Sequence, residues 1–152
     1  MNHLKLFILS VACTGFIACA EAPVPQQSLA GAWRPVAYQL HEGERESVDG
    51  ILFLNDGVWS VVFFVLDESG EPVRGSGEGG SYTVDGDQLA LTHHFVLSAG
   101  QAVGKMHQDP LRMELYGDGG AAGVEKCSYT IADDRLTLFF PSQNQMIFER
   151  IG

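Results

Sequence analysis

The sequence SYTVDGDQLAL, residues 81–91, is the strongest indication of the fold, because nearly the same phrase returns as SYTIADDRLTL at residues 128–138. In each copy an aromatic and a β-branched residue alternate with polar ones, an acidic turn follows, and two leucines alternate after the turn. Apolar residues at every second position are typical of a strand with one buried face, and short turns rich in Asp and Gly are typical of hairpins. Each copy is therefore predicted to form one β-hairpin.

The same alternation continues on both sides of these hairpins. Apolar runs flank an Asp-Gly turn at residues 56–57, and clean alternation returns at residues 111–116 and 146–150. No amphipathic helix stands out. Two copies are too few for a propeller or a solenoid, whereas successive hairpins that face one core are typical of an antiparallel meander. We therefore predict an all-β, antiparallel up-and-down barrel of about eight strands, closed so that its strand edges are covered.

Composition excludes several classes of function. The chain has 152 residues and a formal net charge of −10, which suits one acidic domain with its own core. Binding of nucleic acid, or of an anionic membrane surface, needs clustered Lys and Arg, so neither is expected. We see no H-x-H or H-x-x-x-H spacing and no cysteine cluster, so no metal and no other cofactor is predicted.

The glycine-rich run GSGEGG at residues 75–80 matches the G-x-G-x-x-G pattern of dinucleotide sites. Such a site needs a helix after the glycines, so that helix amides meet the pyrophosphate. Here a predicted strand follows, and Glu78 would repel phosphate. Glycines that permit a β-bulge or a sharp bend of the barrel explain the run better.

The N-terminus predicts export. The apolar run LFILSVACTGFI, residues 6–17, is shorter than the roughly 20 residues of a transmembrane helix and fits the core of a signal peptide. Two processing sites compete. Residues 18–20, ACA, permit ordinary cleavage before Glu21, whereas residues 16–19, FIAC, resemble a bacterial lipobox that would make Cys19 a lipidated first residue.

We accordingly expect a signal peptide at residues 1–20, a polar tether at residues 21–28 and the barrel domain at residues 29–152. The protein would be periplasmic or lipid-anchored in the bacterial cell envelope, with Cys19 as its only membrane attachment. Cys127 is left without a partner. It is either a small buried hydrophobic residue or a reactive thiol.

Both ends of the predicted barrel resemble a known family. The stretch LAGAWR, residues 29–34, resembles the Gly-x-Trp opening strand of lipocalins and the wider calycin barrels, and MIFER, residues 146–150, resembles their last strand. The resemblance implies that Arg150 packs across Trp33 as a cation over an aromatic face and closes one end of the barrel. Residues 80–91 are similar to short bacterial lipocalin-like domains.

An eight-stranded barrel has room inside for packed side chains or for one small ligand. By alternation, His93 stands on a face otherwise made of Leu and Phe, where it could contact a ligand or a metal, act as a base, or be a satisfied core residue. We predict that the barrel binds a small, mostly apolar ligand. The predicted contacts are His93, Tyr82, Tyr129, Phe95 and Met113.

Two other functions stay open. The strand at residues 58–66 is apolar on both faces, so its outer face could form a homodimer or a protein contact. The alternative function is therefore a non-catalytic envelope lipoprotein whose barrel is filled with side chains and which acts in protein–protein interaction. An enzyme that uses His93 with a carboxylate ranks last, because no catalytic constellation can be assigned.

Overall fold

The computed structural model describes residues 28–100, 112–116 and 123–152. The predicted signal peptide, Cys19 and nearly all of the predicted tether lie outside these ranges. No helix among the described residues has the length and apolar character to span a membrane. The described strands are β1 (Gly31–Gln39), β2 (Arg45–Asn55), β3 (Val58–Leu66), β4 (Pro72–Asp85), β5 (Gln88–Gly100), β6 (Arg112–Leu115), β7 (Val124–Ala132), β8 (Arg135–Phe139) and β9 (Gln145–Arg150).

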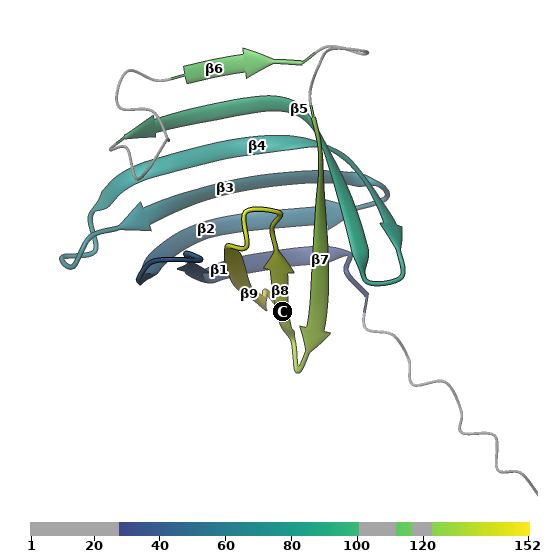
Figure 1. The fold of residues 1–152 in the computed structure, drawn as a ribbon, viewed down its shortest axis with the longest axis horizontal. Helices are drawn as coiled ribbons and strands as arrows, with labels where there is room; N and C mark the ends of the chain where they lie inside the picture. Colours follow the sequence, from purple (N-terminus) through teal and green to yellow (C-terminus); the bar gives the residue numbers. More distant parts are fainter. Residues whose placement is uncertain (1–27, 101–111, 117–122) are drawn as a thin grey trace, which may run out of the picture.

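Eight of these strands form a closed antiparallel barrel. Strands β1 to β5 pair in chain order, β5 pairs with β7, and β9 pairs back with β1. Strand β6 extends the sheet beyond this ring: it pairs with residues 95–98 of β5, whereas β7 pairs with residues 88–92 (Figure 1). The prediction of an all-β, up-and-down barrel of about eight strands is confirmed.

Three tight hairpins explain why the chain meanders. The loops between β2 and β3, β4 and β5, and β7 and β8 each have two residues. Left-handed backbone angles occur at Asp56 and Gly57, at Gly86, and at both Asp133 and Asp134. Turns that begin with positive φ match the right-handed twist of paired strands, and Gly and Asp tolerate that conformation best. The two phrases at residues 81–91 and 128–138 are therefore hairpins of one meander.

Trp33 closes the barrel where β1 begins. Its ring is fully buried, its Nε1–H donates to the Leu29 carbonyl at 2.9 Å, and the Arg150 guanidinium lies 4.0 Å from the ring centroid. The same guanidinium donates to the carbonyls of Ala30 at 3.1 Å and Ser28 at 2.6 Å. Arg150 thus holds both the indole and the chain segment that leads into β1.

Cys127 is a packed core residue. It lies on β7 opposite Leu89 of β5, it is free, and it is fully buried. Burial raises the pKa of its thiol to about 12, with a smaller contribution from the charge of Glu125. The thiolate is therefore disfavoured, which supports the interpretation of Cys127 as a small buried hydrophobic residue.

A β-bulge in β5 reverses the inward or outward direction that strict alternation predicts for the side chains after His93. Gly80 of β4 pairs with His93 and Gly79 pairs with Phe95, so that His94 is the extra residue. A Cβ atom on Gly79 would lie 2.7 Å from the Phe95 ring, which places Phe95 over the glycine on the outer face. The prediction that Phe95 faces the interior is wrong, because strict alternation cannot foresee one inserted residue.

The same bulge explains why the side chain of Met113 lies on the outer face. Met113 of β6 pairs with Leu97, which follows Phe95 on the outer face of β5, and Met113 is 68% exposed. The prediction that Met113 faces the interior is therefore also wrong. The expectation that the glycine-rich run serves a bulge is confirmed by the register shift at Gly79 and Gly80.

The outer face of β3 to β6 is apolar. The outward glycines of β4 carry no side chains, and the neighbouring strands fill the space above them: Gly75 lies under Phe64, and Gly77 lies between Val62 and Leu97. Homodimerisation through this face stays a prediction, which sedimentation equilibrium of the purified protein would check. The exposed apolar side chains of this region include Val62, Phe64, Leu97, Met113 and Leu115.

Candidate functional site: a cavity with an ion-paired histidine

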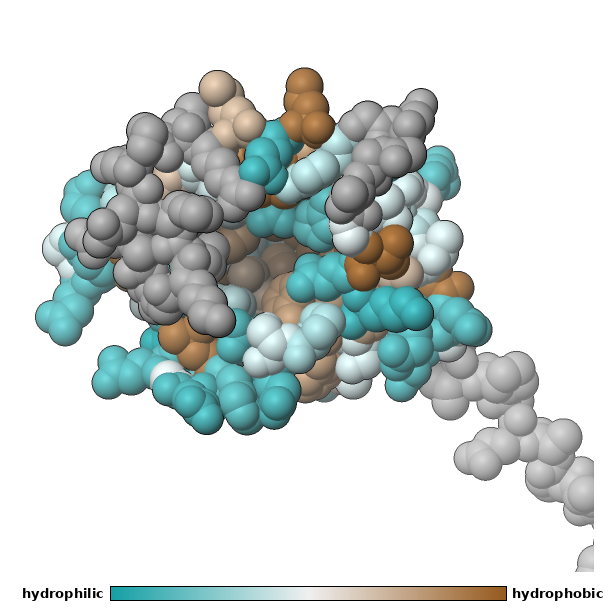
Figure 2. Space-filling view, turned by 45° about the horizontal axis from the view of Figure 1, so that its top comes forward, coloured by the Kyte–Doolittle hydropathy of each residue, from teal (hydrophilic) through white to brown (hydrophobic). Residues whose placement is uncertain are grey.

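The interior of the barrel holds an open cavity of about 440 Å³. That volume lies within the usual range for small-molecule sites, roughly 300–1,000 Å³. Figure 2 shows hydrophobic residues at the bottom of a hollow, with hydrophilic residues along part of its rim. One wall of the cavity is apolar and comes mainly from β2, β3 and β9, with Leu52, Leu54, Val61, Phe63, Met146 and Phe148.

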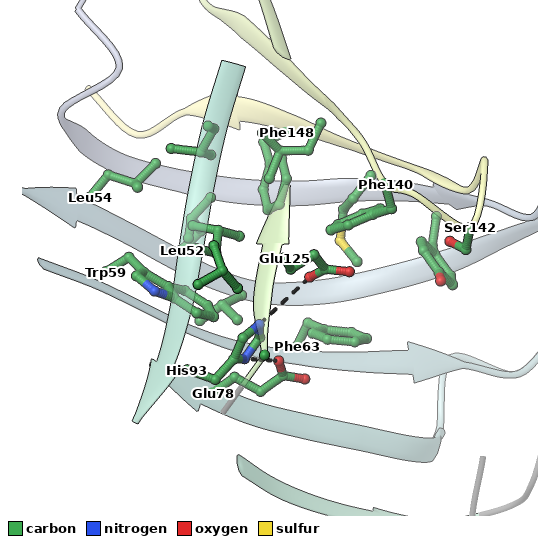
Figure 3. Close-up of a pocket in the computed structure, with 18 residues that line it drawn as sticks. Leu52, Leu54, Trp59, Phe63, Glu78, His93, Glu125, Phe140, Ser142 and Phe148 are labelled. Carbon is green, nitrogen blue, oxygen red and sulfur yellow. Dashed lines mark ion pairs between the residues drawn. The ribbon is translucent and has the colours of Figure 1, made fainter. Parts of the chain in front are cut away.

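The cavity lining also includes three ionisable side chains from three strands. His93 of β5 lies between Glu78 of β4 and Glu125 of β7 (Figure 3). The Nδ1 atom of His93 is 3.1 Å from Glu78 Oε2, and its Nε2 atom is 3.7 Å from Glu125 Oε2. The Nδ1 atom is buried and makes no well-directed hydrogen bond, so its contact with Glu78 is an ion pair that rests on proximity.

Gly80 makes this arrangement possible. Trp59 of β3 and His93 of β5 both pair with Gly80, which has no side chain to separate them. Their rings meet edge to face across β4, with centroids 5.0 Å apart and planes at 88°. The indole Nε1–H of Trp59 donates to the Thr92 carbonyl at 3.3 Å, which anchors the ring beside the histidine.

The two carboxylates keep His93 charged. Glu125 and then Glu78 raise the pKa of His93 to about 9, against the opposing effect of burial. Burial raises the pKa of Glu78, but the contact with His93 and the hydrogen bond from the Ser76 hydroxyl, at 2.6 Å, outweigh burial, so the net pKa of Glu78 is lowered. By formal charge, two carboxylates and one imidazolium together carry one net negative charge.

This charge state limits the chemistry of the site. A protonated imidazole has no free lone pair to accept a proton, so His93 is not a general base near neutral pH. No group of three His, Cys, Asp or Glu side chains within the described ranges could hold a metal ion. The arrangement is suited to contact with a ligand through fixed charges.

We expect the charge of His93 to make the protein less stable in alkali. Because the folded pKa of about 9 lies above the ordinary value of 6.5, the stabilisation is complete below about pH 6.5 and is lost as the pH rises through about 9. Urea unfolding at about pH 6 and about pH 10 measures this loss. His93→Gln should remove much of the difference, whereas His94→Gln, at the neighbouring exposed position, should retain it. If both variants lost the same unfolding free energy between the two pH values, the assignment of this pH dependence to His93 would be contradicted.

A second polar group lies on the same face of β4. Arg74, Ser76 and Glu78 alternate along the strand, and the guanidinium of Arg74 is buried in an ion pair with Glu46 of β2. Sequence reasoning missed Glu78 and Glu125 as site residues. The signal for Glu78 was present: polar residues occupy every second position of the glycine-rich strand, in phase with Gly80.

Of the residues predicted to bind a ligand, His93 lines the cavity. Tyr129 is buried in the core, and its hydroxyl donates to the Gly86 carbonyl at 3.1 Å. Tyr82 packs against the same core and does not line the cavity. Phe95 and Met113 lie on the outer face. The structure therefore brings together His93 with two carboxylates, and not with the two tyrosines.

Comparisons with known proteins support the fold. No family model and no curated protein matches the chain. A solved structure of a lipocalin-like protein from Bacteroides uniformis is 18% identical, with a TM-score of 0.50, over 81% of this chain and 98% of that one. An uncharacterized protein from Bacteroides eggerthii is 14% identical, with a TM-score of 0.50, over 82% of this chain and 100% of that one. The fold is thus that of a lipocalin-like β-barrel.

Proposed function

We propose that this protein binds a small, mostly apolar molecule inside its barrel. The observation that carries the proposal is the cavity of about 440 Å³, with an apolar wall and one group of charged side chains. Ligand sites commonly combine a largely apolar lining with a few polar groups that orient the ligand. The apolar wall would supply most of the contact, and Glu78, His93 and Glu125 would orient the polar end.

The alternative of a barrel filled with side chains has less support. Three bulky residues could have filled the space beside His93. Phe95 lies outside the barrel, and Trp33 and Tyr129 pack into the core without lining the cavity. The apolar outer face keeps a role in protein contact open, but it does not compete with ligand binding for the interior.

Export is part of the proposal and rests on the apolar run at residues 6–17. We propose that the barrel works in the bacterial cell envelope, either released or held by a lipid. The first residue of the mature protein, Cys19 with its added lipid or an unmodified Glu21, identifies the route. Intact mass spectrometry of the exported protein provides that measurement.

A cavity-filling variant tests binding. Val61 lines the cavity, whereas its neighbour Val62 points outward and is 43% exposed. We expect Val61→Phe to weaken binding of the neutral probe N-phenyl-1-naphthylamine by roughly tenfold, about 1.4 kcal/mol, because the added ring would occupy cavity volume that the probe needs. Val62→Phe adds the same ring on the other side of the strand and should bind like the wild type. Fluorescence titration of the full-length exported protein measures both.

Native mass spectrometry of the same protein, purified without detergent, is the complementary measurement. A discrete added mass that is lost on denaturation would support the proposal. Absence of probe binding by the wild type, or equal weakening by Val61→Phe and Val62→Phe, would contradict it.

A further inference from the structure

We infer that the ligand of this barrel carries a cationic head group, of the protonated-amine class, which is held by Glu125 beside the Glu78–His93 pair. This inference rests on the proposed function and specifies its ligand class. The apolar body of the ligand would lie against the apolar side chains of β2, β3 and β9 that line the same cavity.

The first support is the balance of charge on the cavity wall. Two carboxylates, Glu78 and Glu125, face the cavity with one imidazolium between them. The neighbouring Arg74 is 6% exposed and is paired with Glu46, so it adds no net charge. A partly buried excess of negative charge attracts a cation and disfavours an anion.

An anionic head group would also disrupt existing pairs. To reach His93 or Arg74, a ligand carboxylate would have to displace a glutamate and leave that glutamate with an unpaired charge in a partly buried site. Removing one partner from a buried ion pair is strongly unfavourable. A simple fatty acid is therefore a poor fit for this cavity, although its chain would suit the apolar wall.

The second support is the unequal use of the two carboxylates. Both oxygens of Glu78 are engaged, Oε1 by the Ser76 hydroxyl at 2.6 Å and Oε2 by His93 at 3.1 Å. The nearest approach of Glu125 to His93 is 3.7 Å, longer than a hydrogen bond, and its side chain is 36% exposed. Glu125 therefore retains acceptor capacity, and an ammonium group has three donors but no acceptor.

The third support comes from two aromatic side chains that line the cavity. Phe63 and Phe140 line the same cavity as Glu125, and Figure 3 shows both rings on the side of the site away from Trp59. The faces of aromatic rings attract ammonium groups. A cation at Glu125 would thus have an anionic partner and aromatic surface in one cavity, whereas a second anion would have neither.

The test compares three ligands with the same chain: octylamine, octanol and octanoate. Each is titrated against N-phenyl-1-naphthylamine bound to the full-length exported protein at about pH 7. We expect octylamine to bind at least about tenfold more tightly than octanol, because hydrogen bonds between charged groups are stronger than those of a neutral hydroxyl. Octanoate should bind most weakly.

Glu125→Gln supplies the matched variant. It should bring octylamine and octanol to within about threefold of each other, while octanol and the fluorescent probe still bind. Glu68→Gln removes a carboxylate from the exposed turn between β3 and β4 and should leave the order of the three ligands unchanged.

The outcomes separate the two proposals. If the probe and octanol bind but octylamine shows no advantage, or if octanoate binds most tightly, the cationic inference is overturned and ligand binding stands. If Glu125→Gln retains the full preference for octylamine, the assignment to Glu125 is overturned. If neither the probe nor any of the three ligands binds, the proposed function itself fails.

Discussion

Replacing Trp33 by alanine is expected to lower the free energy of unfolding by about 3–5 kcal/mol. The indole is fully buried, and its removal would leave a cavity where β1 enters the barrel. It would also remove the hydrogen bond to the Leu29 carbonyl and the surface on which the Arg150 guanidinium rests. Urea unfolding, followed by circular dichroism because Trp33 itself contributes to fluorescence, measures the change.

Arg34→Ala is the control for this prediction. Arg34 is the next residue on β1 and is exposed, so its truncation should change stability by less than about 0.5 kcal/mol. A loss below about 1 kcal/mol for Trp33→Ala would contradict the role of this residue in closing the barrel. Such a result would show that the end of the barrel collapses around the missing ring at little cost.

The second large effect is expected from Gly80→Ala, which adds a single methyl group. In Gly80→Ala the added Cβ atom would lie 1.9 Å from the Thr92 carbonyl oxygen and 2.9 Å from the His94 amide nitrogen. Both are backbone atoms of the bulge, so β5 must shift to admit the methyl group. We expect a loss of about 1–3 kcal/mol or more in the free energy of unfolding, measured by urea denaturation.

Gly80→Ala should also weaken ligand binding. The Thr92 carbonyl accepts the Trp59 indole hydrogen bond, and the bulge places His93 between its two carboxylates. A shift of β5 would disturb both. Titration with N-phenyl-1-naphthylamine, under conditions in which the variant is still folded, separates this effect from unfolding.

Gly77→Ala is the matched control on the same strand. Its Cβ atom would meet Val62 and Leu97 at 3.7 and 3.8 Å, which are ordinary contacts. The change should therefore be close to neutral in stability and in binding. Equal effects of Gly80→Ala and Gly77→Ala would show that the clash at the bulge is relieved without cost, which would contradict the positioning role of Gly80.

Sequence reasoning succeeded wherever the signal was local. The alternation of Tyr82 and Val84, the acidic turns and the repeated leucines each depend on neighbours within a few residues, and they predicted the hairpins correctly. It failed beyond His93 because one extra residue in β5 moves every later side chain to the other face of the sheet. For that single reason Phe95, and Met113 on the paired strand, lie on the outer face and not on the predicted inner face.

Strand period and turn chemistry are local properties, so the order of residues alone was enough to predict an antiparallel barrel. It also placed His93 on the inner face. The position of Glu78 and Glu125 on either side of that histidine depends on the three-dimensional fold, since the three residues come from separate strands and meet through strand register and one bulge. Only packing in three dimensions decided that the interior keeps a cavity, because empty volume depends on how every inward side chain fills the barrel.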